Sequence, residues 1–111
     1  MPKSKPINNH PPNTPSIDGP KFGKTRKYHT YTICSTDPDG DDISYSITWG
    51  DGLGAKWLGP LPSSVCLQVE HMWFEQGNFN IKVQTRDIYE SESGWGTLEV
   101  KMPKSKPYFN T

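Results

Sequence analysis

Apolar and polar residues alternate along this chain in short runs separated by turns. Residues 43–49 (ISYSITW) alternate strictly, which predicts a β-strand with one apolar face. That face carries Ile43, Tyr45, Ile47 and Trp49. Further strands are predicted at 15–20, 28–36, 65–71, 79–87 and 98–102, and residues 56–60 are either a short extra strand or an ordered loop. No segment has a helical period. About seven short strands with frequent turns predict an all-β chain folded as an immunoglobulin-like β-sandwich.

The two ends of the chain differ from this middle part. Residues 1–15 contain five prolines and few apolar side chains, which predicts an extended N-terminal arm or linker. The sandwich is then expected over 16–102, followed by a tail or linker over 103–111. The hexapeptide MPKSKP occurs at 1–6 and again at 102–107. This repeat indicates either a unit of a tandem array or a duplicated tag.

The leading hypothesis from the repeat is a structural module of an extracellular array or filament, with copies of itself as head-to-tail partners. An arm could assemble such units by adding a strand to a neighbour's sheet edge. The residues expected to act in this assembly are Met1, Pro2, Ile7, Tyr108 and Phe109.

Charge and hydropathy indicate which kinds of partner the chain is not expected to have. The 12 basic and 12 acidic residues give a formal net charge of zero, so no overall field favours nucleic acid. No apolar run approaches the roughly 20 residues that span a bilayer, so no membrane span is expected.

Three stretches resemble the PKD domain, an immunoglobulin-like sandwich of many extracellular proteins. They are Asp37-Pro38-Asp39-Gly40, Trp49-Gly50-Asp51-Gly52 and the run HMWFEQGNFNIKVQTRD at 71–87. Trp73 departs from the pattern, because tyrosine is usual there. The chain as a whole resembles the variant PKD-like modules at the C-terminal ends of secreted archaeal and bacterial surface proteins. The resemblance implies an extracellular or cell-surface location.

A cluster of aspartates is the strongest candidate for a site. Asp37, Asp39 and Asp41 lie within one turn, and Asp87 ends a strand that a sandwich would bring to the same pole. Calcium prefers six to eight oxygen ligands, so these four carboxylates are a candidate calcium site. Some PKD-like domains hold calcium at such a loop. The alternative is a solvated Asp/Gly turn shaped by its own hydrogen bonds.

The two cysteines, the three histidines and Asp51 carry weaker expectations. Cys34 and Cys66 point away from the core on strands that are neighbours in the usual sandwich order, so they are either a cross-strand disulfide or two small thiols. His71 is expected as a hydrogen-bonded histidine at a strand end, and Asp51 as the acceptor of N–H groups in its own turn. His10 and His29 lie in unrelated segments, so no zinc spacing exists.

The sequence lacks a nucleophile elbow, a P-loop and any recognisable acid/base pair, so we expect no enzyme activity and no cofactor besides calcium. The alternative function is a carbohydrate- or protein-binding accessory domain of a secreted enzyme or adhesin. In that case the ligand, for instance a surface glycan, would be bound by Trp57 and Trp95, which lie in loop-like contexts. The alternative is that these two tryptophans pack against other side chains.

Overall fold

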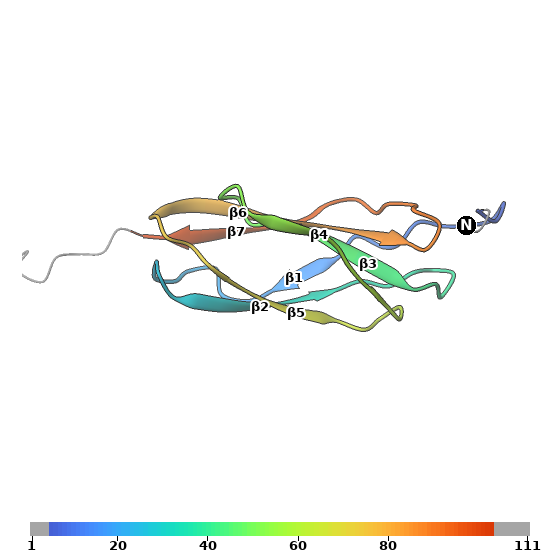
Figure 1. The fold of residues 1–111 in the computed structure, drawn as a ribbon, viewed down its shortest axis with the longest axis horizontal. Coiled ribbons are helices and arrows are strands. Elements are labelled where there is room, and N and C mark those ends of the chain that lie inside the picture. Colours follow the sequence, from blue (N-terminus) through green and yellow to red (C-terminus); the bar gives the residue numbers. More distant parts are fainter. Residues whose placement is uncertain (1–4, 104–111) are drawn as a thin grey trace, which may run out of the picture.

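The computed structural model describes residues 5–103 and arranges their strands in two sheets that pack face to face (Figure 1). The three-stranded sheet has the order β1 (Ser16–Asp18), β2 (Tyr28–Cys34), β5 (Leu67–Met72). The four-stranded sheet has the order β4 (Gly54–Leu61), β3 (Ile43–Thr48), β6 (Gly77–Asp87), β7 (Gly96–Met102). All of these neighbours are antiparallel. The predicted immunoglobulin-like sandwich of seven strands is therefore confirmed.

The core follows from the alternation in the sequence, because every second side chain of a strand points inward. Its fully or almost fully buried members are Tyr31, Ile33, Ile43, Tyr45, Ile47, Trp49, Trp73, Ile81, Val83, Val100 and Met102. Trp49 and Trp73 are core residues, as expected. The Tyr31 hydroxyl donates to the Pro20 carbonyl at 2.7 Å, and burial raises the pKa of Tyr31 to about 12.

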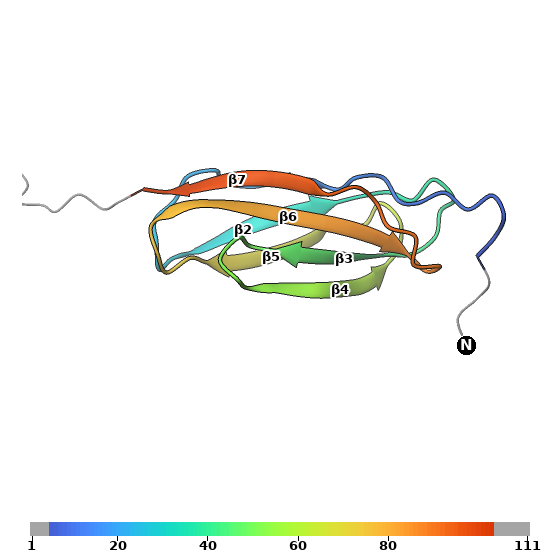
Figure 2. The ribbon, with the colours of Figure 1, turned by 90° about the horizontal axis from the view of Figure 1, so that it is seen from above.

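Strand register brings the apolar faces together. β3 lies opposite β6 with Ile47 beside Val83, and β6 lies opposite β7 with Phe79 beside Val100. The same register places the polar residues of these strands together on the outer face. Figure 2 shows the strands running along the long axis of the molecule, with the described chain entering at one end and leaving after β7 at the other.

The structure differs from the predicted elements in two places. The segment expected at 56–60 belongs to the eight-residue edge strand β4, which contains register shifts opposite β3. The alternation of residues 65–71 predicts Val65 on the apolar face of its strand, but Val65 precedes β5 and is 42% exposed. Within residues 5–103 there is no helix that is long and apolar enough to cross a membrane.

The outer edge of β7 is covered by the segment after β1. Lys101 donates to the Lys21 carbonyl at 2.8 Å, and Gly23 donates to the Lys101 carbonyl at 3.2 Å. This short parallel pairing occupies backbone groups that an exposed edge strand would otherwise offer to another chain.

Candidate functional site

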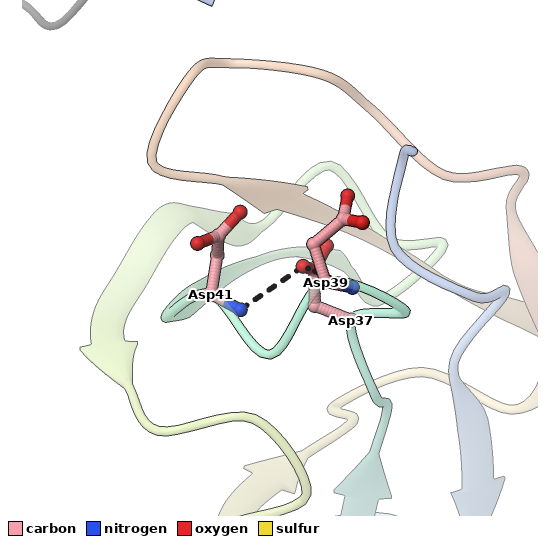
Figure 3. A group of neighbouring side chains, drawn as sticks. All are labelled: Asp37, Asp39 and Asp41. Carbon is pink, nitrogen blue, oxygen red and sulfur yellow. Dashed lines mark hydrogen bonds between the residues drawn. The ribbon is translucent and has the colours of Figure 1, made fainter. Parts of the chain in front are cut away.

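The turn between β2 and β3 holds three of the four aspartates that the sequence singled out. Asp37 is buried, Asp39 is exposed and Asp41 is intermediate. One oxygen of each carboxylate lies within 4.8 Å of the others. Figure 3 shows Asp39 and Asp41 extending to the same side of the turn, with the Asp41 N–H directed at the Asp37 carboxylate.

Asp37 shapes this turn with one carboxylate oxygen, while its other oxygen has no hydrogen-bond partner among the described residues. Its Oδ2 accepts the N–H groups of Asp39 at 3.1 Å and Asp41 at 3.0 Å. Its Oδ1 is buried and has no hydrogen-bond partner among the described residues. An unpaired carboxylate oxygen inside a protein is costly, so this atom is the strongest indication of a ligand at the turn.

Asp87 does not join the cluster, contrary to the four-carboxylate site expected from the sequence. Its Oδ1 accepts the N–H groups of Tyr89 and Ser91 at 2.8 and 3.0 Å. Its Oδ2 accepts from the Asn9 side-chain amide at 2.8 Å. The carboxylate is used within the turn that follows β6, which explains why it is not directed at Asp37.

The N-terminal arm packs against its own domain from Asn9 onward, so the packed region begins before residue 16. Asn9 binds Asp87, and His10 binds Asp39 through its backbone N–H at 2.6 Å and its Nδ1 at 3.1 Å. Asn13 pairs its backbone N–H with the Thr36 carbonyl at 2.8 Å. The two hydrogen bonds from His10 hold the pKa of Asp39 below its ordinary value, and the bond from the backbone N–H of His10 is the larger cause.

Of the five residues expected to act in assembly, the structure describes only Ile7. Ile7 is fully exposed. Met1, Pro2, Tyr108 and Phe109 lie outside the described residues, as does most of each hexapeptide copy.

An aromatic cluster occupies the opposite end of the sandwich. His71 Nε2 lies 2.7 Å from Asp51 Oδ2, and the His71 ring stacks on Trp49 with centroids 4.5 Å apart. Asp51 Oδ1 accepts the Leu53 N–H at 3.1 Å. The Trp73 Nε1–H donates to the Trp49 carbonyl at 3.1 Å. Each polar group named here has a partner, as expected for His71 and Asp51, and this indicates a structural role.

The cysteines and the two remaining tryptophans lie elsewhere. Cys34, at the end of β2, forms a disulfide with Cys66, which directly precedes the neighbouring strand β5, and their Cα atoms are 4.4 Å apart. Trp57 lies in β4 and is half-buried, with the Arg86 guanidinium 4.3 Å from its ring centroid. Trp95 is 48% exposed just before β7. Of the two tryptophans, Trp95 is therefore the more exposed.

A groove on the outer face of the four-stranded sheet was not predicted from the sequence. It measures about 690 Å³ and lies between the β3–β4 turn and the outward side chains of β6. Lys56, Asn78, Asn80 and Lys82 contribute its polar wall. A second hollow of about 370 Å³ continues past Lys82 to Trp95. We call the two hollows together the outer-face groove.

The two sheets, their register and the packed aromatic cluster define an immunoglobulin-like β-sandwich domain. No family model matches the chain, and no curated protein matches it. Among solved structures, it is similar to the PKD domain of an M14-like peptidase from a Thermoplasmatales archaeon. The two are 44% identical with a TM-score of 0.85, over 86% of this chain and 99% of that one. The chain belongs to the PKD domain family, which confirms the resemblance of its three motifs.

More distant structures share the fold. A crystal structure of a CARDB domain from Pyrococcus furiosus, in complex with di-metal ions, is 17% identical with a TM-score of 0.63, over 90% of this chain and 94% of that one. A solution structure of a CARDB domain from the same organism is 18% identical with a TM-score of 0.64, over 83% and 95%. At this identity the likeness extends to the fold alone.

Proposed function

We propose that this chain is a non-catalytic accessory domain of a secreted enzyme, and that it holds the enzyme against a polymer outside the cell. The observation that carries this proposal is the 44% identity, over 86% of the chain, to a PKD domain that belongs to a peptidase. The head-to-tail filament preferred from the repeated hexapeptide finds no support in the similar structures. The accessory domain was the alternative reading of the sequence.

The test compares the secreted polypeptide that contains this domain with a version that lacks it. Mass spectrometry of the culture medium first identifies that polypeptide and any enzyme domain in it. If the domain holds the enzyme to its target, deletion lowers hydrolysis of an insoluble substrate several-fold and leaves hydrolysis of a short soluble substrate unchanged. The proposal would be contradicted if deletion left hydrolysis of the insoluble substrate unchanged or lowered hydrolysis of both substrates equally. A polypeptide without an enzyme domain would also contradict it.

We also propose that the Asp37 turn binds calcium. The supporting observation is the buried, unpartnered Asp37 Oδ1 beside two further carboxylates. Calcium–oxygen distances of about 2.3–2.6 Å allow two ligands of one ion to lie up to about 5 Å apart, so the 4.8 Å span of the cluster fits. The ion would compete with His10 for Asp39, because both oxygens of that carboxylate contact His10.

Calorimetric titration of the full chain with Ca²⁺ tests this second proposal. Asp37→Asn is expected to abolish the binding heat, because it replaces one carboxylate oxygen with an amide NH₂ and removes the charge. Asp42→Asn is the matched control, since Asp42 follows the cluster in sequence but is not part of it. Equal binding by both variants would place the ion elsewhere.

A further inference from the structure

We infer that the outer-face groove binds an anionic polysaccharide. The inference deepens the accessory role proposed above, because it names the class of polymer that the domain recognises. It depends on the shape of the groove, on its charge and on the groups that line it.

The groove extends across the four strands of the larger sheet, from Lys56 on β4 to Thr97 on β7. Thr48, Lys82 and Thr97 lie directly opposite one another on β3, β6 and β7. Thr48 and Lys82 line both hollows, so the two spaces meet at the Lys82 side chain. From position 78 to position 82 a strand advances about 13 Å, which is enough for a short run of sugar units.

The charge of the groove selects an anion. Lys56 and Lys82 line it, and none of its lining residues is acidic. Neither lysine is in an ion pair with another residue of the described range. The nearby Asp51 carboxylate is occupied by His71 and Leu53. Glu99 lies opposite Asn80 on β7 but lines the adjacent hollow at the outer edge of β7, which shares Thr97 with the groove. Two unneutralised ammonium groups in a concave surface favour a ligand that carries carboxylate or sulfate groups.

The lining groups favour a polysaccharide over a polypeptide. The groove lies on the face of the sheet, where the backbone groups of β3 and β6 already pair within the ladder. A peptide therefore cannot gain the main-chain hydrogen bonds that it gains at a sheet edge. Asn78 and Asn80 instead offer side-chain amides to hydroxyl groups. At the other end, the exposed Trp95 ring can pack against the apolar C–H face of a sugar.

Binding of hexagalacturonate to the full chain, measured by calorimetry, is the direct test. Its methyl ester is the neutral probe of equal length, and hexaglutamate is the acidic peptide probe. We expect hexagalacturonate to bind, the ester to bind at least tenfold more weakly, and the affinity for the acid to fall as salt is raised. Equal affinity for the ester would overturn the role of charge, and equal or tighter binding of hexaglutamate would replace the polysaccharide by a peptide.

Two variants with matched controls locate the ligand. Lys82→Gln and Trp95→Ala are each expected to weaken hexagalacturonate binding about tenfold, which is the usual scale for losing a charged hydrogen bond or an aromatic anchor. Lys27→Gln and Phe74→Ala change exposed residues that do not line the groove and should leave the affinity unchanged. Thermal unfolding of each variant verifies that it is folded.

Unchanged affinity in Lys82→Gln, or no binding of hexagalacturonate by the parent chain, would overturn the inference. These outcomes are distinct from failure of the accessory role. The isolated chain binds or does not bind the probe regardless of any attached enzyme, and the deletion test above does not depend on which polymer is recognised.

Discussion

The turns that begin at Asp37 and Asp87 have the same local structure but different surroundings. In each turn one carboxylate oxygen accepts the N–H groups two and four residues along, at 3.1 and 3.0 Å for Asp37 and at 2.8 and 3.0 Å for Asp87. In each, the N–H three residues along donates to the backbone carbonyl of the aspartate. That third residue has a positive φ in both turns, 75° at Gly40 and 67° at Glu90.

The second carboxylate oxygen distinguishes the turns. In Asp87 it accepts a hydrogen bond from Asn9, whereas in Asp37 it is buried without a partner. Asp39 and Asp41 bring carboxylate oxygens within 4.8 Å of that of Asp37, whereas Asp87 belongs to no such group of three among the described residues. The same turn is thus completed by the arm at Asp87, whereas at Asp37 one carboxylate oxygen has no partner among the described residues.

Replacing each aspartate by alanine should have the largest effect and separate the two turns. Asp87→Ala leaves three donors without their acceptor, so we expect a loss of about 3 kcal/mol in the free energy of unfolding. Asp37→Ala in calcium-free buffer should cost about 1–2 kcal/mol, because it also removes the unpaired oxygen. Urea denaturation followed by tryptophan fluorescence measures both. An equal loss in the two variants would show that the unpaired oxygen does not matter.

Calcium should sharpen the comparison. An ion that binds only the folded chain stabilises it by about 2.7 kcal/mol at one hundred times its dissociation constant. We expect this gain in the parent and in Asp87→Asn, and its loss in Asp37→Asn. Melting temperatures with Ca²⁺ and with EDTA check the expectation. If the parent melts at the same temperature in both buffers, the Asp37 turn does not bind calcium.

Removing Asn9 should make the Asp87 turn resemble the Asp37 turn. Asn9→Ala leaves Asp87 Oδ2 without its amide donor, and we expect a loss of about 2 kcal/mol, typical of a hydrogen bond to a charged group. Asn8→Ala is the control, since Asn8 is exposed in the adjacent position. Chemical denaturation measures the free energy of unfolding of the two variants. An equal loss in both would contradict the role assigned to the arm.

The smallest effect is expected from acid titration of Asp39, at the exposed side of the same pole. Because its pKa is lowered in the folded chain, its contribution to stability is present above its ordinary pKa and is lost as the pH falls through the lower folded value. In His10→Ala the pKa of Asp39 should rise only part of the way to its ordinary value, because the backbone N–H of residue 10 remains. Carbon-detected NMR of the side-chain carboxyl follows this titration. A complete return to the ordinary value would assign the shift to the imidazole alone.

Much of the fold could be predicted from local sequence, while the arrangement of the candidate site could not. The period of two in residues 43–49 and 79–87 identified the inward side chains, and the Asp37-Pro38-Asp39-Gly40 turn was recognisable from its residues. Asp87 was assigned to the wrong partner, since its position at a strand end predicts the pole but not the direction of its carboxylate. The sequence of residues 1–15 predicts only a linker or arm, because proline-rich polar segments carry no signal for docking onto their own domain.

The amino-acid sequence by itself determined the inner and outer faces of each strand, the turns and the family, because these depend on side chains close together in the chain. Tertiary structure decided which aspartate is paired and which is open, because the deciding contact joins Asn9 to Asp87 across 78 residues. It also created the outer-face groove, whose residues come from all four strands of the larger sheet and from the β3–β4 turn. Their positions depend on the register between strands, which is set only when the two sheets close over the core.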